Sequence, residues 1–316
     1  MSFKGFFKPK GMSSERSGPT RGDQLGSIIG QHVKKYGLIL HYQPSVPDEA
    51  IVDIVFVHGL TGNAHTTWYH EKSGLHWPSE LLKKDVSNSR IFTFGYDADV
   101  ASFWGPSQNR LTNHASNMVA DLVGVREDTG TEGRALIFIV HSLGGLVVER
   151  ALQYSKDSAE QHLHQIECHT SGIVFLGTPH SGSDFALFAK AVARTLGLVG
   201  KWVNTDILDV LKRESQVLLD LEDWFAHWLR RRIQVQKPVN ITCYFEEIGL
   251  PPMGKVVTEE SARIVGYSSF GIHANHMNMP KFAGAEDIGY KRVRQELRRW
   301  IKQLVQELEK HSDHIN

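Results

Sequence analysis

A serine stands at the end of the most apolar segment of the chain. Residues 136–140 read Leu-Ile-Phe-Ile-Val, and His-Ser-Leu-Gly-Gly (141–145) follows directly, before the helix-compatible pattern of 146–153. A serine on a sharp turn between a strand and a helix forms a nucleophile elbow, in which the turn exposes the hydroxyl above the edge of a sheet. The free N–H groups at the start of the helix favour negative charge nearby. The segment therefore predicts a nucleophile at Ser142.

The elbow departs from its usual pattern at one position. The G-x-S-x-G pattern begins with glycine, and this chain has Val140 there. Small residues are favoured at this position because the strand and helix backbones approach each other closely. A buried strand, a turn and a helix with an incidental serine are the alternative interpretation. A catalytic serine also needs an oxyanion hole, a base and an acid that orients the base, so these groups decide between the two interpretations.

An apolar strand pattern upstream of the serine predicts the oxyanion hole. Residues 51–57 are almost all apolar and end in His-Gly-Leu-Thr-Gly (58–62). In an α/β-hydrolase the two donors are the N–H of the residue after the nucleophile and an N–H from the loop after the third strand. These are Leu143 and Leu60. His58 lies before the serine and on the wrong loop for the base, so we interpret it as a brace for this loop, and we place it with Tyr96 at the substrate-binding surface.

The acid is expected downstream, because the order of the triad in this fold is serine, acid, histidine. The strand-like run 239–245 ends in Glu246 and Glu247. Adjacent strand residues point to opposite faces, so only one of the two carboxylates can orient the base. We predict Glu246, with Glu247 as the alternative. For the base, His273 and His276 compete in the loop that follows a short candidate strand at 263–265.

The chain resembles the α/β-hydrolase domains of the serine active site-containing lipase-like proteins and of fungal NOD-like receptors. The resemblance covers about residues 35–305 and implies that His276, which opens a His-x-x-Met-x-Lys-Phe segment, is the base. It also implies a lipid-like or other hydrophobic ester as the substrate. The matching segments are 52–62, Thr67-Trp68, Trp77-Pro78, 90–98, the elbow, 175–183 (Phe-Leu-Gly-Thr-Pro-His-Ser-Gly-Ser), 244–247 (Tyr-Phe-Glu-Glu) and 276–282 (His-Met-Asn-Met-Pro-Lys-Phe).

Strand and helix patterns alternate along the chain. This alternation predicts an α/β fold of the α/β-hydrolase type, with a mostly parallel central sheet and helices on both faces. Active sites of such sheets lie at the carboxyl ends of the strands, where all the candidate residues fall. The strand-like runs are 38–42, 51–57, 90–95, 135–140, 172–177, 240–246 and a last one near 263–265.

The sequence divides into an arm, a catalytic domain and an insert. Residues 1–30 are predicted to form a flexible arm, and 35–310 the hydrolase domain. Amphipathic helical patterns at about 184–236 predict a helical cap over the site, lined to take an apolar group, with ordinary packing helices as the alternative. The basic arm carries three phenylalanines, so a peripheral membrane contact is possible. The oligomeric state is not indicated.

Composition excludes several classes of function. Hydrophobic residues make up 41% and charged residues 22% of the 316 positions, and the formal net charge of +0 gives no support for nucleic-acid binding. The two cysteines form no disulfide framework, which favours an intracellular, cytoplasmic protein. No apolar run approaches the ~18 residues that span a bilayer. We find no metal-ligand spacing, P-loop or dinucleotide fingerprint, and so expect no cofactor or metal.

Together these residues predict acyl transfer to water. Ser142 would attack an ester or thioester carbonyl, His276 would transfer the proton, and Glu246 would orient the histidine, with an acyl-enzyme intermediate. The second hypothesis is a signalling or interaction module of the same fold with weak or no catalysis.

Overall fold

The computed structural model describes residues 36–98, 110–180, 188, 191, 205–252 and 254–313, with only the backbone described for 205–215 and 311–313. The predicted arm, 1–30, lies outside these residues, as does most of 184–204 at the start of the predicted cap. The domain boundaries therefore stay predictions.

A seven-stranded sheet forms the centre of the domain, in the order β1-β5-β2-β6-β7-β8-β9. All neighbouring strands are parallel except β1 and β5, which pair antiparallel at one edge. This is the mostly parallel sheet of an α/β-hydrolase, as the alternation of patterns predicted. The strands are β1 Gly37–Tyr42, β2 Val52–Val57, β5 Ser89–Gly95, β6 Ala135–His141, β7 Thr170–Leu176, β8 Asn240–Glu246 and β9 Ser268–Ile272.

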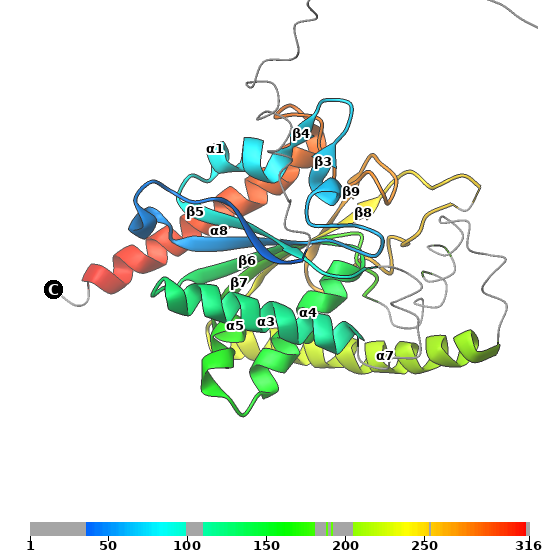
Figure 1. Cartoon of the computed structure of the whole chain (residues 1–316), viewed down its shortest axis with the longest axis horizontal. Helices are drawn as coiled ribbons and strands as arrows, with labels where there is room; N and C mark the ends of the chain where they lie inside the picture. Colours follow the sequence, from blue (N-terminus) through cyan, green and yellow to red (C-terminus); the bar gives the residue numbers. More distant parts are fainter. Residues whose placement is uncertain are drawn as a thin grey trace, which may run out of the picture. The chain divides into compact units, whose positions relative to one another are not determined.

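Helices cover both faces of the sheet (Figure 1). Helices α3, α4, α5 and α7 pack on one face, and α1 and α8 on the other, so the core consists of two apolar layers. The helices are α1 Lys83–Asp85, α3 Arg110–Asp128, α4 Leu143–Asp157, α5 Gln165–His169, α7 Thr205–Gln234 and α8 Ile288–Asp313. The short helical turns are η1 Pro47–Glu49, η2 Thr66–Trp68, η3 Pro78–Leu82 and η4 Gln161–His164. A small hairpin consists of β3 Tyr69–His70 and β4 Leu75–His76. No helix within the described ranges is both long and apolar enough to cross a bilayer.

The central strands are buried along their whole length, which is why they read as continuous apolar runs. The charged exceptions are Asp53 in β2 and Arg90 in β5. The Asp53 carboxylate contacts three guanidinium groups, those of Arg90 at 2.7 Å, Arg126 at 2.8 Å and Arg134 at 3.5 Å. A charge in such a strand is tolerated because it is paired and hydrogen-bonded. The cluster also joins β2, β5 and the end of α3.

The prediction of the last strand is wrong by several residues. Residues 263–265 form no strand, and Val265 is 99% exposed. The strand is instead β9, whose Ser268 pairs with Thr242 and whose Ile272 pairs with Glu246 of β8. An edge strand is held by hydrogen bonds on one side only and is partly exposed, so its sequence needs no apolar run. The shift leaves the loop that carries His276 directly after the strand.

The second half of the predicted cap is a packing helix. From Leu218 onward α7 turns an apolar face toward α4 and the sheet, and Phe225 and Trp228 are buried in the core on that side. Phe188 is one of the two described residues between 181 and 204, and its ring contacts that of His276. The predicted cap over the site stays a prediction.

Candidate active site

Ser142 occupies a strained turn between β6 and α4. It has φ 54° and ψ −128°, a backbone conformation that costs a non-glycine residue roughly 1–3 kcal/mol. The turn is held by two hydrogen bonds: Ser142 N–H donates to Leu176 O at 2.9 Å, and Thr178 Oγ1 donates to Ser142 O at 3.0 Å. A Cβ on Gly144 would collide with the carbonyl oxygens of Val57 and His58, so glycine is needed where α4 begins against β2. This is the geometry of a nucleophile elbow.

Val140, which replaces the usual glycine of the elbow, is fully buried. It pairs in register with Val57 of β2 and Phe175 of β7 and packs in the core beneath the turn. The elbow therefore forms with valine at this position.

The structure brings Ser142, His276 and Glu246 into one hydrogen-bonded row. His276 Nε2 lies 2.9 Å from Ser142 Oγ, and His276 Nδ1 lies 2.6 Å from Glu246 Oε2. A carboxylate only accepts, so Nδ1 carries the hydrogen and Nε2 is free to accept the serine proton. Glu246 Oε1 accepts a second hydrogen bond from Val256 N–H. All three residues are at most 3% exposed.

The two alternative residues lie elsewhere. Glu247 points away from Glu246, as adjacent strand residues must. Its Oε2 lies 3.1 Å from His273 Nδ1, and the two side chains are 43% and 84% exposed. Glu247 and His273 thus form a surface pair apart from Ser142.

Gly177, which the sequence reasoning did not identify, lies beneath the imidazole of His276. Its φ is +62°, and a Cβ there would come within 3.1 Å of His276 Nδ1 and 2.8 Å of Met279 Sδ. Only glycine allows the chain to leave β7 this close to the ring. The glycine directly after a buried strand, in Gly-Thr-Pro, was the available signal.

The loop after β2 passes directly over the nucleophile. A Cβ on Gly59 would lie 2.6 Å from Ser142 Cβ and 2.8 Å from His141 O. On the far side of Leu60 the loop is fixed by Thr61 N–H, which donates to Ala98 O at 2.8 Å. Neither Leu60 N–H nor Leu143 N–H donates to an oxygen of the described residues. Two uncommitted donors therefore flank the serine, one on this loop and one at the first residue of α4.

His58 and Tyr96 brace this loop from below. His58 Nδ1–H donates to Gly59 O at 2.9 Å, and its Nε2 accepts from Tyr96 N–H at 3.2 Å. Tyr96 OH donates to His58 O at 2.8 Å, and the two rings are stacked with centroids 4.3 Å apart. Burial lowers the pKa of His58 to about 4, so the ring is neutral and keeps one tautomer at neutral pH. With both residues at most 5% exposed, their predicted contact with substrate stays a prediction.

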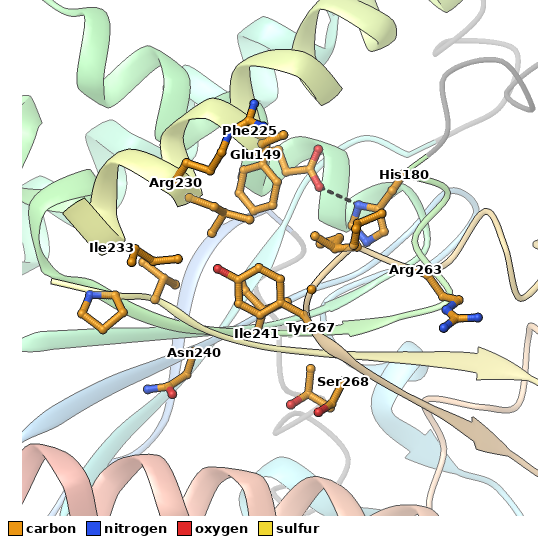
Figure 2. Close-up of a pocket in the computed structure, with 18 of the residues that line it drawn as sticks. Glu149, His180, Phe225, Arg230, Ile233, Asn240, Ile241, Arg263, Tyr267 and Ser268 are labelled. Carbon is orange, nitrogen blue, oxygen red and sulfur yellow. Dashed lines mark hydrogen bonds and ion pairs between the residues drawn. The ribbon is translucent and has the colours of Figure 1, made fainter. Parts of the chain in front are cut away.

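A separate cavity of about 680 Å³ lies between α7 and the starts of β8 and β9. Figure 2 shows Ile233 of α7 on one side of it and Ile241 and Tyr267 on the other. At its inner end His180 Nδ1 lies 2.9 Å from Glu149 Oε1. Burial lowers the pKa of His180, but the nearby Cys243 and the hydrogen-bonded carboxylate of Glu149 raise it to about 10 overall. None of the residues that line this cavity belongs to the Ser142 row.

The described residues contain no group of three His, Cys, Asp or Glu side chains that could hold a metal ion. Beside Ser142 the structure places one histidine and one carboxylate, His276 and Glu246. This arrangement can activate a hydroxyl for attack on a carbonyl and stabilise the oxyanion that results.

Comparison with known proteins agrees with this chemistry. A family model described as "Putative serine esterase (DUF676)" matches residues 52–246. Protein SERAC1 of Mus musculus is 26% identical over 285 residues, covering 84% of this chain and 42% of the relative. Protein SERAC1 of Danio rerio is 27% identical over 280 residues, covering 81% and 40%. The chain thus spans about two fifths of the length of these curated relatives.

Among solved structures, the chain is similar to the lipase BlEst2 of Bacillus licheniformis in its mature form. The identity is 18% and the TM-score 0.48, with 84% of this chain and 97% of the lipase covered. Esterase B from Lactobacillus rhamnosis is 12% identical with a TM-score of 0.46, covering 92% of this chain and 93% of the esterase.

Proposed function

The chain belongs to the family of serine esterases whose model matches it, and from that premise we propose that it hydrolyses hydrophobic carboxylic esters or thioesters through a Ser142–His276–Glu246 triad. Membership of the family gives the coarse activity, that of a serine esterase. The triad, the acyl-enzyme intermediate and the kind of substrate are the proposal.

In the proposed reaction Ser142 Oγ attacks the acyl carbonyl carbon while His276 Nε2 accepts the hydroxyl proton. The N–H groups of Leu60 and Leu143 donate to the oxyanion of the tetrahedral intermediate, and Glu246 stabilises the imidazolium that forms. His276 then protonates the leaving alcohol or thiol as the bond between it and the acyl carbon breaks. Water attacks the resulting acyl-serine while His276 accepts one of its protons. The second intermediate then collapses as the bond between the acyl carbon and Oγ breaks and His276 returns the proton to Oγ, which releases the acid and restores Ser142.

One observation supports the proposal above the others. Ser142 Oγ, His276 and Glu246 Oε2 are connected at 2.9 Å and 2.6 Å, and a hydrogen on Nδ1 facing the carboxylate leaves Nε2 able to accept the serine proton. An incidental serine in this turn would not require a buried histidine and a buried carboxylate beside it. His276 and Glu246 lie 30 residues apart in the sequence, yet both are buried here. The connected row also favours catalysis over an interaction module without activity.

An apolar substrate is supported by what surrounds the row. The ring of Phe188 lies edge-on to His276, with centroids 6.2 Å apart, and Phe188 is 2% exposed. Leu60 and Leu143 contribute the proposed oxyanion donors with apolar side chains. An acyl chain would lose no hydrogen bonds on entering such surroundings. Peripheral membrane contact and an intracellular location stay predictions.

Labelling with a fluorophosphonate probe tests the proposal. We expect one adduct, mapped by peptide mass to Ser142 and missing in Ser142→Ala. Ser116→Ala is the control, because Ser116 lies on α3 and its hydroxyl donates to Asn113 O, one helical turn away. Absence of an adduct from folded wild-type protein, or an adduct that persists in Ser142→Ala, would contradict the assignment of the nucleophile.

A further inference from the structure

His141, the residue before the proposed nucleophile, contacts the proposed base. Its Nε2 lies 2.9 Å from the backbone carbonyl oxygen of His276, and the two imidazole centroids are 5.0 Å apart. The residues are separated by 135 positions in the sequence. His141 is the last residue of β6, so its side chain connects the strand that positions Ser142 to the loop that carries His276.

The acceptor determines the protonation of His141. A carbonyl oxygen cannot donate, so the hydrogen of the neutral ring must be on Nε2. Burial and the nearby His276 hold the pKa of His141 well below its usual range, and the ring is 4% exposed. The neutral state matters because His276 must become positive during turnover, and a second positive ring 5.0 Å away would oppose this.

The loop that carries His276 is also fixed by hydrogen bonds on either side of that residue. Ile248 N–H donates to Ala274 O at 3.2 Å before His276, and Trp77 Nε1–H donates to Pro280 O at 2.8 Å after it. Asn275 O accepts from Asn278 N–H and Met279 N–H within the turn itself. The bond from His141 acts on the backbone of His276, between these two anchors.

We infer that His141 is a positioning residue, whose Nε2–H bond to the carbonyl of His276 sets the distance between the serine hydroxyl and the base. The inference rests on the proposed function, because it concerns the same triad. The hydrogen bond of His141 goes to the backbone of His276 and not to the nitrogen that accepts the proton. It acts by fixing the backbone of His276 relative to the adjacent Ser142, so that Nε2 of the base stays within hydrogen-bond reach of Oγ.

The expected effect follows from how strongly proton transfer depends on geometry. Displacement of a catalytic group by about 1 Å can slow a reaction about 10²-fold. Loss of the His141 bond leaves the two flank anchors in place, so we expect a loss of about 10- to 100-fold in kcat. Binding of the acyl group does not use this contact, so KM should change by less than about twofold.

The test compares His141→Met with His141→Gln. Both side chains are unbranched and similar in length, but only glutamine places an N–H near the position of Nε2. With p-nitrophenyl butyrate and a fluorophosphonate probe, we expect His141→Met to lose about 10- to 100-fold in kcat and in labelling rate. His141→Gln should stay within about threefold of wild type. A purely structural role would give no such rescue.

His164 offers a matched control. Its Nε2 donates to Ser158 O at 2.7 Å, the same kind of bond, beyond the far end of α4. His164→Met should lower the temperature of thermal unfolding and His164→Gln should lower it less, and neither should change kcat. If His141→Met does not fold, His141→Asn replaces it, because its shorter amide cannot reach the carbonyl and should show the same loss.

The outcomes separate this inference from the proposed function. Wild-type protein that is not labelled at Ser142 contradicts both. Normal wild-type labelling together with full activity of folded His141→Met, or an equal loss in folded His141→Met and His141→Gln, overturns the positioning role alone.

Discussion

Replacing Glu246 with glutamine removes one negative charge from a fully buried position while keeping the shape of the side chain. The charge faces His276, which becomes positive when it accepts the proton of Ser142. For charge centres about 4 Å apart and an effective dielectric constant of about 20, the attraction is about 4 kcal/mol. Its loss corresponds to about 10³-fold in kcat/KM. The amide N–H₂ can also donate to Nδ1, which would favour the unproductive tautomer and add to the loss.

Glu247→Gln is the matched control for this change. It removes the same charge from the next residue, whose side chain is 43% exposed and pairs only with His273 at the surface. The pair lies apart from Ser142, and exposed pairs contribute at most about 1 kcal/mol, so kcat/KM should fall by less than about fivefold. We would measure p-nitrophenyl butyrate hydrolysis and thermal unfolding of both variants. A loss below about tenfold in folded Glu246→Gln, or equal losses in the two variants, would refute the reasoning.

Three further predictions concern the loop over the serine, the buried charges and the response to acid. Gly59→Ala should slow fluorophosphonate labelling by at least about 10²-fold, because the added Cβ would lie 2.6 Å from Ser142 Cβ and displace the loop with its donor; labelling at the wild-type rate would contradict this. Asp53→Asn should lower the free energy of unfolding by about 3–5 kcal/mol in urea titrations, because it leaves three guanidinium groups without their carboxylate. A change under about 1 kcal/mol would show that the cluster contributes little. The pKa of His58 is about 4 in the folded chain against its usual 6.5, so the unfolded chain binds the proton more readily. The contribution of His58 to the free energy of unfolding, about 3 kcal/mol, should therefore be fully present above about pH 6.5 and be lost as the pH falls to about 4. A urea midpoint that does not move over this range would be inconsistent with a buried neutral ring.

Local patterns in the sequence were enough for most of the sheet. Strands that are buried on both faces are mostly apolar, so β2, β5, β6 and β7 are visible as runs rich in apolar residues. The elbow is also local, because a strand, a serine and a glycine-rich helix start are consecutive. β9 was misplaced because an edge strand carries little apolar signal.

The arrangement around the serine was only partly accessible. The sequence limited the acid to Glu246 or Glu247 and left His273 and His276 both open until the resemblance favoured one. Adjacent strand residues point to opposite faces of the sheet, so a shift of one residue at the end of β8 would exchange which carboxylate faces the ring of His276. That choice needs the paired strands, because the propensities of the two glutamates are identical.

The sequence by itself determined the class of fold, the nucleophile candidate and the order of the chemical groups, because each depends on neighbours within a few residues. The tertiary structure alone decided which groups meet. It placed Gly59 against Ser142 and Gly177 against the ring of His276. It also brought His141 within hydrogen-bond distance of the backbone carbonyl of His276, 135 residues later in the sequence. Such contacts arise where parallel strands end at one edge of the sheet, and no local pattern encodes a distance between residues so far apart in the chain.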